Sequence, residues 1–230
     1  MPFRDIKTIH FDLDGTLIDS VGDLTLAIND MCRKLGLQPY DVSQVRLWVG
    51  NGSAMLVKRA LQGKREIEET AIEEAYFQQA HTIFLDAYET HLCEATRPYP
   101  GVIDTLAWLK DQGYKLTIIT NKPTRFLPKL LAGLALESFF DAVAGGDTYA
   151  RKKPDPLPLE RMCQACDTPV ERALMVGDSR NDLLAARACG MRSVAVSYGY
   201  HGDEELRIYR PLAVIDRFDE LRTLLPKERT

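Results

Sequence analysis

One stretch decides the fold of this chain: Phe11-Asp12-Leu13-Asp14-Gly15-Thr16-Leu17. It continues the run from Lys7 to Phe11, whose β-branched and aromatic residues are typical of a strand. Two aspartates one residue apart are a poor continuation of a strand, and Gly15 lets the backbone turn where a side chain would clash. Both carboxylates can therefore face one point at the carboxyl end of a sheet, where open α/β folds bind their ligands.

An Asp-Gly pair alone often only caps a turn. A second acidic turn changes this interpretation, because Val176-Gly177-Asp178-Ser179-Arg180-Asn181-Asp182 again follows an apolar run. Two further segments carry polar groups of the same kind. The apolar run from Lys115 to Ile119 ends in Thr120-Asn121, and Lys152-Lys153-Pro154-Asp155-Pro156 places a lysine before a proline-started helix. Each signal is weak alone, whereas the ordered set of four is specific.

The four acids Asp12, Asp14, Asp178 and Asp182 would crowd together at this edge of the sheet. Two like charges about 4 Å apart repel by about 4 kcal/mol at an effective dielectric constant of 20. A cation must therefore lie among them. Mg²⁺ fits, because it takes hard oxygen ligands, keeps several waters and bridges carboxylates to phosphate oxygens. Lys153 would add a further positive charge, so the pattern predicts a magnesium ion and a phosphate group.

These four motifs resemble those of the haloacid dehalogenase-like hydrolase superfamily, over a span from Ile9 to about Val196. A narrower resemblance, to bacterial phosphoglycolate phosphatases, is carried by four strings of residues. They are Trp48-Val49-Gly50-Asn51-Gly52, Thr120-Asn121-Lys122-Pro123, Lys152-Lys153-Pro154-Asp155-Pro156 and Ser197-Tyr198-Gly199-Tyr200.

The resemblance implies a catalytic role for three residues. Asp12 is the expected nucleophile, which attacks phosphorus and forms an aspartyl-phosphate. Asp14 is the expected general acid and base, which protonates the departing alkoxide and then takes a proton from the attacking water. Lys153 would stabilise charge in the transition state. An acid at position 14 points to ester hydrolysis or phosphoryl transfer, because a dehalogenase has no alkoxide to protonate.

The resemblance also implies which residues hold the metal and the phosphate. Asp12, the backbone carbonyl of Asp14 and Asp178 are expected to ligate Mg²⁺. Asp182 is expected either to support these ligands or to hold Lys153. Thr120 and the backbone amide of Asn121 would donate hydrogen bonds to the phosphoryl oxygens.

The four motifs do not distinguish among phosphate-ester substrates, so substrate specificity has to come from residues outside them. Gly50-Asn51-Gly52-Ser53 precedes a predicted helix, and the amino terminus of a helix attracts anions. We expect Asn51 and Gly52 to receive the carboxylate of a small substrate such as 2-phosphoglycolate, with Lys122 as a second candidate. An ordinary loop with a serine cap is the alternative. The same catalytic residues would also suit a phosphatase or phosphomutase acting on a sugar phosphate, a nucleotide or pyrophosphate. A binding or regulatory protein that kept the fold and lost activity is a second alternative, which the presence of all the expected acids and bases disfavours.

The predicted fold class is α/β: a doubly wound parallel sheet with a Rossmann-like core and an inserted all-helical cap domain. The predicted cap spans residues 19–96 and the core residues 1–18 and 97–230. Ser20 with Asp23 resembles a capping box at the start of the first helix. The other cap helices are predicted over Asp41 to Trp48, Ser53 to Leu61 and Glu66 to Leu92. After a stiff exit segment, Arg97-Pro98-Tyr99-Pro100-Gly101, helices and strands alternate, as in a parallel sheet covered on both faces.

Composition excludes several classes of protein. With 230 residues and 45% hydrophobic content the chain can bury a large core. Its net charge of −4 and the lack of a basic stripe argue against nucleic acid as a partner. No apolar run approaches the roughly 20 residues of a membrane span, and the charged N-terminus does not resemble a signal peptide, so we expect a cytoplasmic protein. Its expected partner is a small phosphate ester, and its expected oligomeric state is a monomer or homodimer. The five cysteines do not indicate a disulfide framework, and Cys163 and Cys166 are expected to pack inside a helix.

Overall fold

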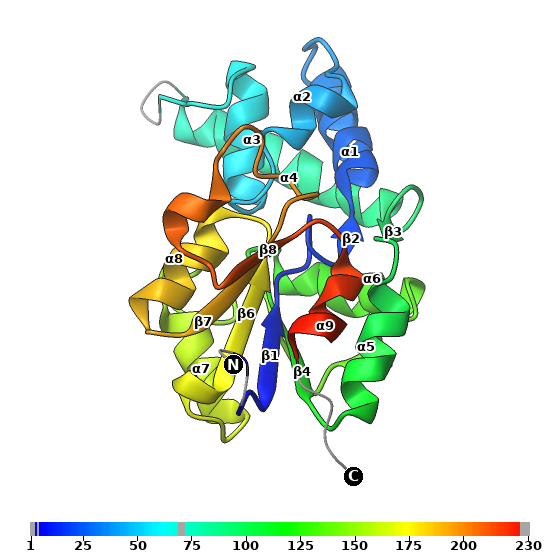
Figure 1. Cartoon of the computed structure of the whole chain (residues 1–230). Coiled ribbons are helices and arrows are strands. Elements are labelled where there is room, and N and C mark those ends of the chain that lie inside the picture. The colour runs from blue at the N-terminus through cyan, green and yellow to red at the C-terminus, as the bar shows by residue number, and fades with distance from the viewer. Residues whose placement is uncertain (1–2, 4, 69–71, 226–230) are drawn as a thin grey trace.

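A six-stranded parallel sheet forms the centre of the molecule (Figure 1). The computed structural model describes residue 3 and residues 5–68 and 72–225. The strand order β5-β4-β1-β6-β7-β8 confirms the predicted doubly wound arrangement, since the chain builds outward from β1 on one side and then on the other. The strands are β1 (Thr8–Phe11), β4 (Lys115–Ile119), β5 (Ala142–Ala144), β6 (Ala173–Gly177), β7 (Arg192–Val196) and β8 (Ala213–Ile215).

Helices cover both faces of the sheet. Successive residues of β6 point to opposite faces, so that Leu174 and Val176 join one apolar core while Ala173 and Met175 join another. The first core contains side chains of α5 (Val102–Asp111) and α9 (Leu221–Leu224), and the second those of α7 (Leu157–Ala165) and α8 (Arg180–Ala188). Helix α6 (Leu127–Gly133) follows β4. Burial on both sides explains why the strands read as continuous apolar runs.

A block of four helices stands over the carboxyl ends of the strands (Figure 1). Its members are α1 (Val21–Lys34), α2 (Val42–Arg46), α3 (Ser53–Gln62) and α4 (Glu74–His91). We call this block the insert. The sequence predicted an all-helical insertion here, and the structure confirms it. None of the helices in residues 5–68 and 72–225 is long and apolar enough to cross a membrane.

The last insert helix was predicted to begin at Glu66, and this start was wrong. Helix α4 begins at Glu74. Gln62 explains part of the difference, because its side-chain amide donates to the carbonyl of Glu68 at 2.8 Å and accepts from the Glu68 amide at 3.0 Å. These bonds fasten the Glu68 backbone to the end of α3 instead of to a helix of its own. Residues 69–71 of the predicted helix lie outside the described residues.

A two-stranded antiparallel ribbon joins the insert to the sheet, and the sequence analysis did not predict it. In this ribbon β2 (Ile18–Asp19) pairs with β3 (Arg97–Pro98), with Ile18 opposite Pro98. The ribbon therefore brings the entry and the exit of the insert side by side. The domain boundaries predicted after residues 18 and 96 fall at this ribbon and stay a prediction, and residues 1, 2, 4 and 226–230 of the predicted core lie outside the described residues.

The predicted capping box of Ser20 and Asp23 was also wrong. Ser20 donates its hydroxyl hydrogen bond to Asp14 at 2.5 Å, not to the helix. Asp23 is fully buried and reaches across to the exit segment, where it accepts hydrogen bonds from the backbone amides of Cys93, Ala95 and Thr96 and from the Thr96 hydroxyl. A tertiary contact to four donors has replaced the local cap, because a buried carboxylate needs several donors.

Replacing Asp23 should therefore destabilise the junction between the insert and the core. In Asp23→Asn one carboxylate oxygen becomes an amide group that cannot accept, and buried donors of the exit segment lose their partner. We expect the free energy of unfolding to fall by roughly 3 kcal/mol, measured by urea denaturation. The matched control is Asp86→Asn on the exposed side of α4. A change in Asp23→Asn no larger than that of the control would contradict this role.

Candidate active site and metal centre

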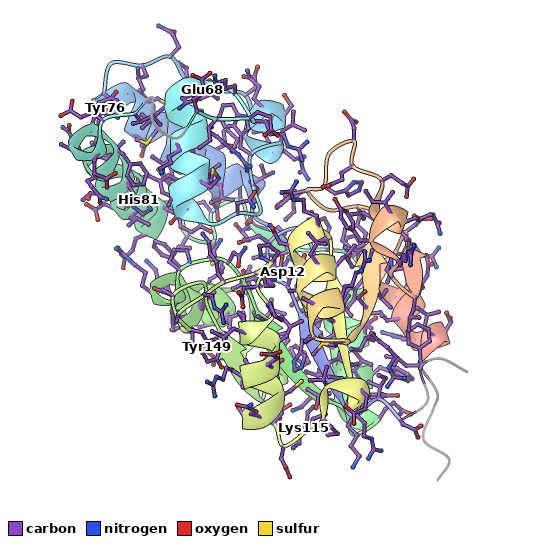
Figure 2. All side chains as sticks on the ribbon, turned by 90° about the vertical axis from the view of Figure 1, so that its left-hand side faces the viewer. Asp12, Glu68, Tyr76, His81, Lys115 and Tyr149 are labelled. Carbon is purple, nitrogen blue, oxygen red and sulfur yellow. The ribbon has the colours of Figure 1, made fainter. Side chains whose placement is uncertain are left out.

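The predicted site residues follow the carboxyl ends of neighbouring strands. Asp12 comes directly after β1, and its amide donates to the Val176 carbonyl at 2.9 Å, which carries the β1–β6 pairing one residue further. Thr120 comes directly after β4, and its amide donates to Ala144 at 3.0 Å. Figure 2 shows Asp12 at the junction of the sheet with the insert, whereas Lys115, at the start of β4, lies at the opposite end of the sheet. The parallel strands thus bring distant parts of the sequence to one edge.

Three carboxylates form a buried cluster at this edge. Asp12, Asp178 and Asp182 each offer one oxygen, and these oxygens all lie within 4.8 Å of one another. The sequence analysis grouped Asp14 with them, but its carboxylate is not part of this cluster. Ligation by the Asp14 backbone carbonyl stays a prediction. An all-oxygen donor set of this kind suits Mg²⁺, Ca²⁺ or Mn²⁺.

Lys153 is the cation that pairs with the cluster among the described residues. Its Nζ lies 2.9 Å from Asp12 Oδ1 and 2.5 Å from Asp182 Oδ1, and it donates to the Ile119 carbonyl at 2.5 Å. Three carboxylates against one ammonium leave two negative charges. Burial raises the pKa of Asp12 to about 7 although Lys153 lowers it, and burial together with the neighbouring acids raises the pKa of Asp178 well above its ordinary value. A divalent cation would remove this charge excess.

Two glycines beside the cluster make space for its carboxylates. Gly15 has a φ of +88°, and a Cβ at this position would collide with the carboxylate of Asp178. A Cβ at Gly177 would likewise collide with Asp182. The oxygens are also oriented by hydrogen bonds, since Asp178 Oδ2 accepts from the Tyr200 amide at 2.6 Å and Asp182 Oδ2 from the Ser179 hydroxyl at 2.7 Å. Such fixed carboxylates are typical of metal ligands.

Asp14 and Lys122 form a second ion pair beside the cluster. Lys122 Nζ lies 2.8 and 2.9 Å from the two carboxylate oxygens of Asp14, and Ser20 donates to Asp14 Oδ1 from the other side. Both side chains are largely buried. Burial alone would lower the pKa of Lys122, but the Asp14 carboxylate raises it above its ordinary value. Lys122 therefore remains an ammonium ion next to the acid expected to meet the leaving group.

Asp12 and Asp14 both line a cavity between the sheet edge and the insert. Thr120, Asn121, Lys122 and Gly52 also line it. The Asn121 side-chain amide donates to the Lys153 carbonyl at 2.9 Å and to Gly50 at 3.3 Å, so it connects the core with the insert. Asn51 is not among the lining residues, and its backbone carbonyl accepts from Lys152 Nζ at 2.8 Å.

Comparison with known proteins agrees with this geometry. The family model described as haloacid dehalogenase-like hydrolase matches residues 9–196. The chain belongs to the haloacid dehalogenase-like hydrolases. The resemblance seen in the four motifs is thereby confirmed, and the buried carboxylates of this hydrolase lie within the matched span.

Named relatives narrow the likeness further. The hydrolase is 43% identical over 223 residues to a phosphoglycolate phosphatase of Psychrobacter arcticus, covering 97% of each chain. It is 45% identical over 221 residues to a phosphoglycolate phosphatase of Pseudomonas putida, covering 96% of this chain and 79% of that one. Among solved structures, a predicted phosphoglycolate phosphatase from Haemophilus somnus matches with a TM-score of 0.89 and 34% identity, covering 96% of this chain and 98% of that chain.

Sequence reasoning missed the part that Tyr200 takes in this hydrolase. Its amide holds Asp178, while its hydroxyl accepts from the Ser20 and Val21 amides at 2.7 and 3.1 Å and donates to Asp19 Oδ1 at 2.7 Å. The residue thus connects the carboxylate cluster with the start of the insert. The string Ser197-Tyr198-Gly199-Tyr200 was quoted for its resemblance, but nothing in it signals a contact 180 residues away.

The other residues weighed in the sequence play structural parts. His10 is fully buried, and its ring contacts the Thr117 hydroxyl at 2.6 Å. His201 contacts the backbone carbonyls of Ser197 and Glu204. Cys163 lies on α7 and Cys166 directly follows its last residue, and both are free and buried in the core, in keeping with the predicted packing role.

Proposed function

We propose that this hydrolase is a magnesium-dependent phosphatase that converts 2-phosphoglycolate to glycolate and phosphate through an aspartyl-phosphate on Asp12. One observation carries the proposal: a buried three-carboxylate cluster lies next to a separate acid, Asp14, in a single cavity. Relatives that share 43% and 45% identity over nearly the whole chain and are named phosphoglycolate phosphatases support the substrate.

The reaction needs two acids in different roles. Asp12 attacks phosphorus, and the bond from phosphorus to the ester oxygen breaks while Asp14 gives that oxygen a proton. Water then attacks the phosphorus of the aspartyl-phosphate and loses its proton to Asp14, which releases phosphate and restores Asp12. The positions of the two side chains support this division, since Lys153 and the cluster hold Asp12 while Ser20 and Lys122 hold Asp14.

The remaining residues would bind and orient the phosphoryl group. Asp12, Asp178 and Asp182 offer the oxygens that would hold magnesium, together with the backbone carbonyl of Asp14. Bound there, the ion would act as a Lewis acid and offset charge on the phosphoryl oxygens. Thr120 and the Asn121 amide would donate to these oxygens, and Lys153 would stabilise the charge that develops on them.

The lining of the cavity favours a small acidic substrate. Of the described residues that line it, Lys122 is the only cationic one, and it lies beside Asp14, where the leaving group must be. Leu24, Leu56, Phe84 and Phe126 supply an apolar wall. The hydroxyls of a sugar phosphate would lose water against this wall without gaining hydrogen bonds, and this disfavours the sugar alternative. Gly52 and Asn51 remain candidates for the carboxylate end, with Gly52 on the lining and Asn51 beside it.

A substrate panel tests the proposal. Specificity constants would be measured with Mg²⁺ for 2-phosphoglycolate, glucose 6-phosphate, a nucleoside monophosphate and pyrophosphate. We expect 2-phosphoglycolate to exceed the others at least about tenfold, because its small planar carboxylate can pair with the buried Lys122 ammonium. A higher specificity constant for any other compound would identify that compound as the better substrate and contradict the proposal. Failure to hydrolyse even p-nitrophenyl phosphate would favour a binding protein instead. The cytoplasmic location and the monomer or homodimer state stay predictions.

A further inference from the structure

A buried tyrosine of the insert lies against the Asp14–Lys122 pair. Tyr88 is on α4 and only 1% exposed, and it lines the same cavity as the two charged residues. Lys122 Nζ lies 4.7 Å from the centre of the Tyr88 ring. The Tyr88 hydroxyl is buried and has no acceptor for its hydrogen within the described part of the chain, since the neighbouring Lys122 ammonium can only donate. Leaving such a donor unpaired is costly, so its position next to a cavity calls for a ligand.

Comparing the unpaired polar groups of the cavity wall indicates whether this ligand is an anion. Among the lining side chains, two buried atoms lack a partner: Asn121 Oδ1 and the Tyr88 hydroxyl. Asn121 Oδ1 can only accept and would repel an anion, whereas the Tyr88 hydroxyl can donate. The neighbouring Ser53 hydroxyl is already paired with His81 at 2.9 Å. Thr120 also lines the cavity, but its hydroxyl is expected to donate to the phosphoryl oxygens. Tyr88 is therefore the donor left for the rest of the substrate, and it lies beside an ammonium.

The length of 2-phosphoglycolate decides which part of it could reach this donor. The carboxylate carbon is separated from the ester oxygen by a single methylene group. If Asp14 protonates the ester oxygen, the carboxylate must lie among the neighbours of Asp14. Lys122 contacts both oxygens of Asp14, and the Tyr88 ring packs against Lys122. The reacting oxygen and the carboxylate would thus be held by adjacent side chains.

We propose that the Tyr88 hydroxyl donates a hydrogen bond to the substrate carboxylate and, together with Lys122, selects phosphate esters that carry an acid next to the ester carbon. This inference rests on the proposed function and assigns a specificity residue, contributed by the insert, that takes no part in proton transfer. Closure of the insert over the sheet edge is then coupled to recognition of the carboxylate, because the donor and the ammonium come from different parts of the fold.

The test compares two substrates of equal length in two variants. Ethyl phosphate has the carbon skeleton of 2-phosphoglycolate without the carboxylate. In Tyr88→Phe we expect kcat/KM for 2-phosphoglycolate to fall roughly 10- to 100-fold, mainly through KM, while kcat/KM for ethyl phosphate changes less than about threefold. The thermal midpoint should change little, because the lost hydroxyl donates to no acceptor in the described part of the chain. Tyr99→Phe is the control, since it removes another buried hydroxyl that lies outside this cavity.

Three results would overturn the inference. Equal losses on both substrates would indicate a structural role for Tyr88, and no loss on 2-phosphoglycolate in Tyr88→Phe would show that the carboxylate is bound elsewhere. Either result leaves the proposed function standing. If the wild-type enzyme itself did not prefer 2-phosphoglycolate to ethyl phosphate, both the proposed substrate and the role of Tyr88 would fall.

Discussion

Asp12→Asn should lower kcat for 2-phosphoglycolate at least about 10⁴-fold while the fold stays intact. The amide has nearly the shape of the carboxylate, but its oxygen is a poor nucleophile toward phosphorus. Lys153 keeps its contacts with Asp182 and the Ile119 carbonyl, so the buried ammonium is not left without partners. The loss should therefore be chemical and not structural.

The nucleophile can also be seen directly. Mass spectrometry of acid-quenched enzyme should find a phosphoryl group on Asp12 during turnover of the wild-type protein and none in the variant. The control is Asp86→Asn, which makes the same chemical change on the exposed side of α4. A kcat for Asp12→Asn within about tenfold of the wild-type value would remove Asp12 from the mechanism.

The elements that the sequence predicted well are those with a local physical cause. Asp12 and Asp178 each follow an apolar run buried on both faces of the sheet, and a carboxylate cannot continue such a strand at low cost. The parallel arrangement then brings these strand ends to one edge. No knowledge of distant contacts is needed to expect that the two acids meet.

The elements that the sequence did not predict depend on distant partners. Asp23 resembles part of a local cap, but the amides that it accepts from lie 70 and more residues further along the chain. In the sequence, Tyr88 looks like any other core residue of its helix. Its contact with Lys122, which marks it as a candidate binding residue, is visible only in the structure. A pattern of residue types carries no record of such pairings, which tertiary packing decides.

Magnesium should stabilise the folded protein as well as activate it. The thermal midpoint therefore tests metal binding at this site independently of catalysis. When all three are ionised, Asp12, Asp178 and Asp182 carry two more negative charges than Lys153 offsets, and all four side chains are buried. At a magnesium concentration near 100 times its dissociation constant we expect a gain of about 2.7 kcal/mol, or roughly 5–10 °C in the thermal midpoint. Chelation with EDTA should reverse the shift and stop turnover.

Asp178→Asn separates this effect from general stabilisation by salt. Removing one buried charge should raise the thermal midpoint of the metal-free protein, because less repulsion remains among the acids. The same change should abolish most of the magnesium-dependent shift, since a ligand is lost. Asp86→Asn should keep the wild-type shift. If Asp178→Asn responded to magnesium as strongly as the wild-type protein, the ion would bind elsewhere, and the three carboxylates would need another cation to balance their charge.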